Sequence, residues 1–215
     1  NGDYFLTTAL GKDEAQKQFS QHVRRREKGW DTEKGIFATY RSIERSQSGR
    51  EEVDKKLGEF FRQDAALAVD LVSEEDETGD HEKSNGNALI DLVQNTWGSD
   101  KIFQFNSIIA HTQACVDGPA LKLGHKYEEL SRKTGGLVGD ICSENYSQLL
   151  KEIGKGVADL KKTHKLKCVP QDVDNNGVAD LEIVSKEGHP IPGYALDGKT
   201  VIFDQVLKVG DYEFN

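Results

Sequence analysis

The sequence predicts an α/β fold, in which a mostly parallel sheet with helices on both faces is followed by a small antiparallel β module. Ala65–Val72 is an almost continuous apolar run, long enough for a strand and too short for a typical helix. Such runs and amphipathic helical patterns alternate up to about residue 163, which implies right-handed crossovers between parallel strands. Beyond that point, short strand-like runs and turns replace the helical patterns.

Helical periodicity predicts three helices before the first strand of the sheet. Ala15, Phe19 and Val23 recur at helical spacing in a charged segment. Asp31 and Thr32 are good N-cap residues for the helix that follows them. The elements predicted in this part are a short strand at 4–8 and helices at 12–28, 33–45 and 53–61.

The alternation continues after the first strand of the sheet. Apolar runs predict strands at 101–110 and 137–142, and amphipathic patterns predict helices at 88–97, 124–133 and 145–162. The polar segment at 78–87 and the segment at 111–123 read as exposed loops. Residues 1–163 are therefore predicted to form a Rossmann-like, doubly wound domain.

Residues 164–215 are predicted to form a separate small β extension. Asp197-Gly198, placed between two alternating segments, is a strong hairpin signal. The predicted strand segments are HKLKCV, ADLEIVS, GYAL, KTVIFDQV and GDYEF.

Composition limits the classes of function. The 215 residues are 36% hydrophobic and 30% charged, with a formal net charge of −9. This acidic balance argues against nonspecific binding to nucleic acid or to an anionic membrane. No apolar segment approaches the length of a membrane span. The chain has no Met, and we interpret it as a piece of a longer protein.

The first sheet strand ends in Ser73 and four carboxylates, Glu74–Glu77. Ligands of open α/β sheets bind beyond the carboxyl ends of the strands, where acidic groups can hold a cation. A solvated acidic loop that only terminates the strand fits the pattern as well. Asp70 interrupts the apolar run, so either this strand is less central or Asp70 faces a polar seam.

Several segments together resemble the von Willebrand factor A domain of bacterial secreted and surface proteins. They are GWDTEKGIFATYRSIE, FFRQDAALAVDLVSEEDE, KIFQFNSIIAH with the Cys115 loop, and GHKYEELSRKTGGLVGDICS, and they fall within residues 3–163. The residues from 164 onward resemble the short all-β extension that follows such domains in some of these proteins.

The resemblance implies a metal-ion-dependent adhesion site. Thr32 matches the Thr of the second loop of that site, and Glu74, beside Ser73, falls where the third loop has an Asp. The DxSxS loop, and the central strand before it, are absent from the sequence. A Mg²⁺ site is therefore expected only if another segment or chain supplies the missing loop, because Mg²⁺ demands near-octahedral oxygen geometry.

Residues 172–180 fit the first nine positions of a calcium-binding loop, DxDxNGxxD. The candidate ligands are Asp172, Asp174, Asn176, the Val178 carbonyl and Asp180. The acid expected at position 12 is missing, because Ile183 stands there. The alternative interpretation is a polar turn between two strands.

Two of the three cysteines are predicted to pair. Cys115 follows the strand at 101–110, and Cys142 ends the strand at 137–142. If these strands are parallel neighbours, both cysteines lie at the same edge of the sheet, within the Cα separation that a disulfide requires. Cys168 is expected at the opposite end, and a disulfide places the protein in an oxidising, extracytoplasmic compartment. Reduced cysteines in a cytosolic protein are the alternative.

We therefore expect a noncatalytic binding or adhesion module of a secreted or cell-envelope protein, which binds a protein or glycan ligand at the carboxyl ends of the strands. A structural subunit whose sheet is completed by a strand from another segment or chain is the alternative. A third interpretation is a metal-dependent hydrolase that uses the acidic cluster at 74–76. No catalytic residue is assigned, since the six His are scattered without a recognisable motif.

Overall fold

The computed structural model describes residues 5–23, 32–63, 65–79, 82–118, 120, 122–208 and 211–215. The chain divides into two compact units, residues 1–32 and residues 33–215. The first unit contains a short 3₁₀ helix, η1 (Thr8–Leu10), and α1 (Lys12–Val23). The predicted helix at 12–28 is confirmed to residue 23, and its remainder lies outside the described residues. The predicted strand at 4–8 is wrong for residues 5–7, which belong to no strand, while residue 4 is not described.

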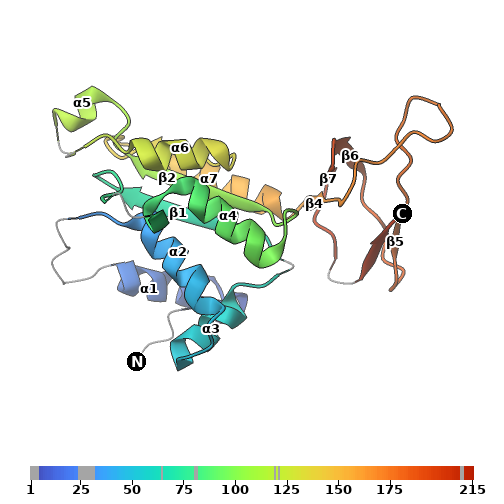
Figure 1. Cartoon of the computed structure of the whole chain (residues 1–215), viewed down its shortest axis with the longest axis horizontal. Coiled ribbons are helices and arrows are strands. Elements are labelled where there is room, and N and C mark those ends of the chain that lie inside the picture. The colour runs from blue at the N-terminus through green and yellow to red at the C-terminus, as the bar shows by residue number, and fades with distance from the viewer. Residues whose placement is uncertain are drawn as a thin grey trace. The chain divides into compact units, whose positions relative to one another are not determined.

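A three-stranded parallel sheet forms the centre of the second unit, as Figure 1 shows. The strands are β1 (Leu67–Ser73), β2 (Phe103–Ile109) and β3 (Val138–Asp140), in the order β1-β2-β3. β1 and β2 pair along their whole length, whereas β3 pairs only with the last three residues of β2. The α/β class, the parallel direction and all three strand positions are thus confirmed.

Helices α2 (Gly35–Ser46), α4 (Gly86–Trp97) and α6 (His125–Lys133) cover one face of this sheet. Their apolar residues meet those of the strands in one core, which is largely removed from water. The buried members of this core are Ile36, Ile43, Leu67, Leu89, Val93, Phe105, Ile109, Tyr127 and Leu130. The helices predicted at 33–45, 88–97 and 124–133 are thus confirmed, with their ends shifted by one or two residues.

Helix α7 (Tyr146–Leu160) packs against the opposite face of the sheet, at β3. Val138 packs against the core of the first face, and its neighbour Gly139 points the other way, because side chains alternate along a strand. A Cβ at Gly139 would lie only 2.4 Å from Leu149 of α7, so glycine permits this close approach. A shorter helix, α3 (Glu52–Phe60), packs beside α2.

The two segments predicted as loops contain short helices. The segment at 78–87 includes η2 (Glu82–Ser84) and the start of α4, whose first backbone N–H groups are capped by the Asn85 side chain. The segment at 111–123 contains α5 (Gln113–Val116), which Thr112 caps. Cap residues were present in both segments, but the polar composition concealed them.

The C-terminal residues form two small antiparallel sheets. One has the order β4-β7-β6, from β4 (Thr163–Lys165), β6 (Tyr194–Asp197) and β7 (Thr200–Phe203). The other pairs β5 (Ile183–Ser185) with β8 (Tyr212–Phe214). The predicted Asp197-Gly198 hairpin is confirmed, with Gly198 at a φ of 57°. The division of the chain at residue 163 stays a prediction.

Asp70 lies on a strand at the edge of the sheet, since no other strand among the described residues pairs with β1. Its side chain is exposed and accepts a 2.8 Å hydrogen bond from Asn106 Nδ2 of β2. The less central position of the strand therefore explains how a carboxylate fits into an apolar run.

Among the described helices, none is both long and apolar enough to cross a membrane.

Candidate functional site

The carboxyl end of β1 leads into a tight acidic turn. Ser73 is buried, and its Oγ donates a 2.9 Å hydrogen bond to the Glu75 carbonyl. The same Oγ accepts a longer bond from the Glu75 N–H. The hydroxyl of Ser73 is thus engaged in shaping the turn that directs the following carboxylates.

Glu77, the last of these carboxylates, caps a helix that lies about forty residues earlier in the chain. Its Oε2 accepts from the Ile36 N–H at 2.8 Å, and its Oε1 accepts from the Phe37 N–H at 3.0 Å. The hydroxyl of Tyr127 donates to Glu77 Oε2 and accepts from the Gly35 N–H. Glu77 and Tyr127 together satisfy the first three N–H groups of α2, which otherwise has no side-chain cap.

Asp76 caps the N-terminus of α6 in a similar way. Its Oδ1 accepts from the Lys126 N–H near the start of that helix, at 3.0 Å, and from the Glu77 N–H. The Lys126 ammonium in turn donates to the carbonyls of Glu77 and Gly79. Two of the four carboxylates at the end of β1 therefore hold helices in place.

The negative charge of the remaining carboxylates at this edge is balanced only in part by basic side chains. Glu74 is exposed, and Glu75 pairs with Lys122 at 3.3 Å. Glu33, at the start of the second unit, is half-buried beside them, and burial together with the charges of Glu74, Glu75 and Glu77 raises its pKa. No described basic side chain forms an ion pair with Glu33 or Glu74. We call the side chains of Glu33, Glu74 and Glu75 the acidic edge.

The raised pKa of Glu33 gives a pH-dependent expectation. Because the folded-state pKa lies above the unfolded-state value, ionised Glu33 lowers stability at neutral pH, and this cost disappears once the group is protonated. We therefore expect Glu33→Gln to melt at a higher temperature than the wild type at pH 7, with the difference shrinking towards about pH 4, near the ordinary Glu pKa of about 4.3. Melting curves across this range measure it, and a variant less stable than wild type at pH 7 would contradict it.

The residues predicted for an adhesion site are divided between the two units. Ser73 is engaged in the turn, Glu74 faces solvent, and Thr32 is the last residue of the first unit. The groups of acidic, His or Cys side chains that converge closely enough for an ion lie elsewhere in the described residues. The participation of Thr32 and Glu74 in a metal site stays a prediction.

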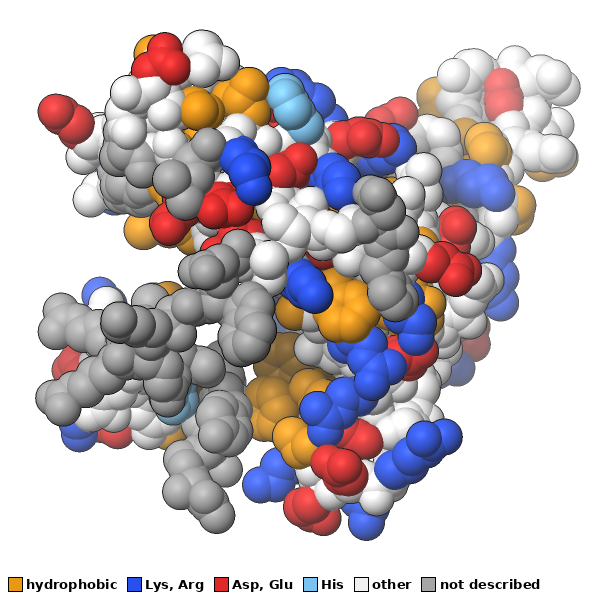
Figure 2. Space-filling model, turned by 60° about the vertical axis from the view of Figure 1, so that its left-hand side comes forward, with side chains coloured by type: hydrophobic (Ala, Val, Ile, Leu, Met, Phe, Trp, Pro, Cys, Tyr) orange, Lys and Arg blue, Asp and Glu red, His pale blue; other side chains and the backbone are white. Residues whose placement is uncertain are grey.

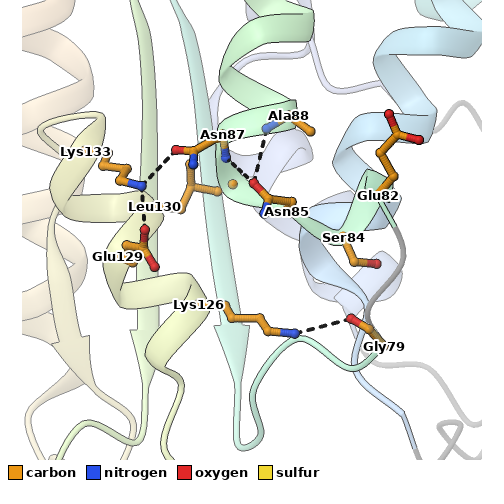
Figure 3. Close-up of a pocket in the computed structure, with 11 residues that line it drawn as sticks. Gly79, Glu82, Ser84, Asn85, Asn87, Ala88, Lys126, Glu129, Leu130 and Lys133 are labelled. Carbon is orange, nitrogen blue, oxygen red and sulfur yellow. Dashed lines mark hydrogen bonds and ion pairs between the residues drawn. The ribbon is translucent and has the colours of Figure 1, made fainter.

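A cleft of about 470 Å³ opens between α4 and α6 (Figure 3). Its walls are the start of α4, one face of α6, and Gly79, Glu82 and Ser84. The two lysines in its wall are engaged, since Lys126 donates to the Gly79 carbonyl and Lys133 contacts Asn87 Oδ1 and Glu129. At this cleft Gly86, which has no side chain, lets Leu130 of α6 approach α4 closely. No sequence motif predicts this contact.

A second group of polar side chains lies at the carboxyl ends of β2 and β3. Cys115 and Cys142 form a disulfide with a Cα–Cα distance of 5.7 Å, as the sequence predicts. Asp140 Oδ1 accepts from the Cys142 N–H, and His111 Nε2 lies 3.9 Å from Asp140 Oδ2. Cys168 is exposed and unpaired, which agrees with the prediction that it stays outside this bridge.

The calcium-like loop brings its three aspartates together. The carboxylates of Asp172, Asp174 and Asp180 each offer an oxygen within 4.8 Å of the others. Backbone N–H groups of the loop already point at them, with Gly177 donating to Asp172 at 2.7 Å and Val173 to Asp180 at 2.8 Å. Both the calcium loop and the polar turn fit this arrangement.

Comparison with known proteins identifies no relative. No family model matches the chain, and neither a curated protein nor a solved structure does. The resemblance to the von Willebrand factor A domain stays a prediction from the sequence.

Proposed function

We propose that this chain is a noncatalytic binding module, of the von Willebrand factor A type, that binds a protein or glycan through the carboxyl edge of its sheet. The observation that supports this proposal most is the acidic edge. Glu33 and Glu74 concentrate negative charge there without a basic partner among the described residues, and the pKa of Glu33 is raised by burial first and by the neighbouring carboxylates second. Lys, Arg or a cation supplied by a partner would neutralise this charge.

A binding role suits this edge better than hydrolysis. Asp76, which a metal-dependent hydrolase would need, is occupied in capping α6, and Ser73 in forming the turn. Figure 2 shows acidic and basic side chains interspersed over the visible face. Because this face does not carry charge of a single sign, the ligand would be selected by the charge at the acidic edge itself. In this proposal the sheet belongs to a doubly wound domain, and Mg²⁺ binds only where the missing DxSxS loop is supplied.

The experiment compares wild type with the Glu33→Gln/Glu74→Gln variant on arrays of immobilised glycans and extracellular-matrix proteins. We expect wild type to bind at least one component, with binding weakened at least tenfold in the double variant and reduced by added salt. Glu59→Gln, which removes an exposed charge on α3, is the control and should bind as wild type does. Equal binding by wild type and double variant to every component would refute the proposal.

We also propose that the loop at 172–180 binds Ca²⁺. Asp174→Ala should then lower the melting temperature in calcium buffer and leave it unchanged in chelator, because a ligand specific to the native state adds stability by mass action. Among the described residues, the Asp174 carboxylate otherwise accepts only from the Asn176 N–H and the Asn176 side chain, and the chelator measurement accounts for the loss of these bonds. Wild-type melting temperatures that are identical with calcium and with chelator would favour the polar turn.

A structural subunit is the second candidate, and β1 is the observation that favours it. β1 is seven residues long and has a partner on one side only among the described strands. Val72 is 58% exposed, and an exposed, unpaired edge with apolar side chains is a template for another strand. A strand from a neighbouring copy would complete the sheet.

The hydrogen-bonding pattern of β1 supplies a sharp test. Leu67 N–H points at β2, where it donates to Ile102, so the N–H groups of Ala68, Asp70 and Val72 point outward. Val72→Pro therefore removes only an outward donor, which a folded edge strand tolerates. If copies pair here, sedimentation should show wild type associating and Val72→Pro monomeric. If wild type stays monomeric up to about 100 µM, pairing with a binding free energy more favourable than about −5 kcal/mol is excluded.

The disulfide supports an extracytoplasmic location, on the principle that such bonds persist in oxidising compartments. We propose the periplasm, the cell surface or the extracellular space. Peptide mapping without reduction, on protein from its native compartment, tests this, and free thiols at both Cys115 and Cys142 would contradict it.

A further inference from the structure

Three side chains with metal-ligating atoms converge at the carboxyl ends of β2 and β3. The ligand atoms of Cys115, Asp140 and Cys142 all lie within 4.8 Å of one another. His111 lies beside this group, with its Nε2 3.9 Å from Asp140 Oδ2, and would have to turn towards the two sulfurs to become a fourth ligand. The set has two short sequence pairs, His111 with Cys115 and Asp140 with Cys142, which the adjacent strands bring together.

We propose that the reduced chain binds one Zn²⁺ through His111, Cys115, Asp140 and Cys142, and that formation of the disulfide expels the metal. Reduction by a dithiol or a phosphine adds two electrons and two protons, which breaks the S–S bond and yields two thiols. Zn²⁺ then displaces the two thiol protons to form two thiolate–zinc bonds. A disulfide oxidant returns the Cys115–Cys142 bond by thiol–disulfide exchange: it takes up the two electrons and two protons, leaves as two thiols, and Zn²⁺ is released.

The chemistry of the four ligands matches zinc. Two thiolates, one imidazole and one carboxylate suit a tetrahedral Zn²⁺ ion and do not suit Ca²⁺ or Mg²⁺, which take oxygen ligands. Zn–N and Zn–O bonds of about 2.0–2.1 Å place two such ligand atoms about 3.3 Å apart in a tetrahedron. The present separation of 3.9 Å between His111 and Asp140 needs only a small adjustment of two partly exposed side chains.

The backbone already holds three of the ligands in position. Asp140 Oδ1 is fixed by the 2.8 Å bond from the Cys142 N–H, which leaves Oδ2 for the metal. The Thr112 side chain caps α5 by accepting from the Cys115 N–H, which fixes the start of the segment that carries that sulfur. Ala110 and Ala120 pack against Cys115, which is 3% exposed, so the floor of the site is apolar. Exclusion of water at this floor favours thiolate–zinc bonding.

Disulfide and metal use the same two sulfurs, so each form excludes the other. A zinc-bound dithiol would keep Cys115 and Cys142 from pairing wrongly with the exposed Cys168 before the chain reaches an oxidising compartment. According to this proposal, a reduced, zinc-bound form of the chain precedes the disulfide-bonded form. The proposal does not depend on which ligand binds at the acidic edge.

The test uses the full chain with Cys168→Ser, reduced with a phosphine under anaerobic conditions and titrated with Zn²⁺ against a chromophoric chelator. We expect one tight site in the reduced protein and binding at least a hundredfold weaker in the oxidised protein. Co²⁺ should give the visible spectrum of a tetrahedral ion with thiolate-to-cobalt charge-transfer bands. Circular dichroism of the reduced, metal-free protein verifies that it is folded.

Two variants test the other ligands without removing the cysteines. Asp140→Asn keeps the oxygen that accepts from Cys142 N–H, and His111→Ala removes a partly exposed ring, so both should fold. Each is expected to weaken zinc binding at least tenfold, while Asp117→Asn, in the same loop, should not. The proposal is overturned if reduced wild type binds zinc no tighter than Cys115→Ser/Cys142→Ser. It is overturned equally if both ligand variants bind as wild type does.

Discussion

Glu77→Ala is expected to lower the melting temperature by about 10 °C, which corresponds to roughly 3–4 kcal/mol for a chain of this size. Glu77 is 3% exposed, and its carboxylate accepts from Ile36 N–H, Phe37 N–H and the Tyr127 hydroxyl. Hydrogen bonds to a charged group contribute about 1.5–3 kcal/mol each, and buried donors left without a partner add a further cost. The loss of a negative charge at the N-terminus of α2 acts in the same direction.

Graded variants separate the hydrogen bonds of Glu77 from its bulk. Glu77→Gln keeps the shape but loses the charge and one acceptor, so it should fall between wild type and Glu77→Ala. Tyr127→Phe removes only the hydroxyl, and we expect a smaller loss, since the ring stays stacked on Phe105 in the core. Glu75→Ala, two residues earlier, is the control, because Glu75 caps no helix N–H among the described residues. A Glu77→Ala protein that melts within 2 °C of wild type would show that water replaces the cap.

The cap of α2 shows why the sequence predicted the helix correctly and its cap wrongly. The apolar spacing of α2 was visible, and the helix lies where it was expected. Thr32 was predicted as a cap because of its type and place, but the helix starts at Gly35 with Lys34 as the N-cap residue and no local side-chain cap. The carboxylate that replaces it comes from 41 positions along the chain, through the folded sheet. Capping rules consider only residues close to the helix start in the sequence, so they cannot predict a capping group from so far along the chain.

The strands were predictable because burial on a sheet leaves a continuous apolar run: β2 and β3 lie within the predicted runs, and β1 extends one residue past its run, to Ser73. The expected pairing of Cys115 with Cys142 followed from that arrangement, since the two parallel strands end at one edge. The approach of His111 to Asp140 was not predictable. It depends on β3 pairing Asp140 with Ile109, and a slip of this three-residue register would carry the two side chains apart.

The same limit applies to the acidic end of β1. Four carboxylates in a row were visible in the sequence, Glu74–Glu77, and their roles differ according to what faces them. Asp76 and Glu77 meet helix N-termini and become structural, whereas Glu74 meets solvent. Glu33 joins this group only in three dimensions, and no local signal in the sequence connected it with the strand.

Removal of the disulfide is expected to have the other large effect. The bond joins residues 27 positions apart, and closing a loop of that size restricts the unfolded chain by about 3–4 kcal/mol. Cys115→Ser/Cys142→Ser should therefore melt roughly 10 °C below wild type under oxidising conditions. Cys168→Ser, which removes the exposed unpaired thiol, should melt as wild type does.

Reduction of wild type tests the same contribution without a mutation. We expect the reduced, metal-free protein to melt at the lower temperature of the double Ser variant, because both lack the cross-link in the unfolded state. Zn²⁺ should then raise the melting temperature of the reduced wild type and leave that of the double variant unchanged, since only the former retains both thiolates. If reduction leaves the melting temperature of wild type unaltered, the bridge does not contribute to stability, and its place at the sheet edge would serve the thiol chemistry alone.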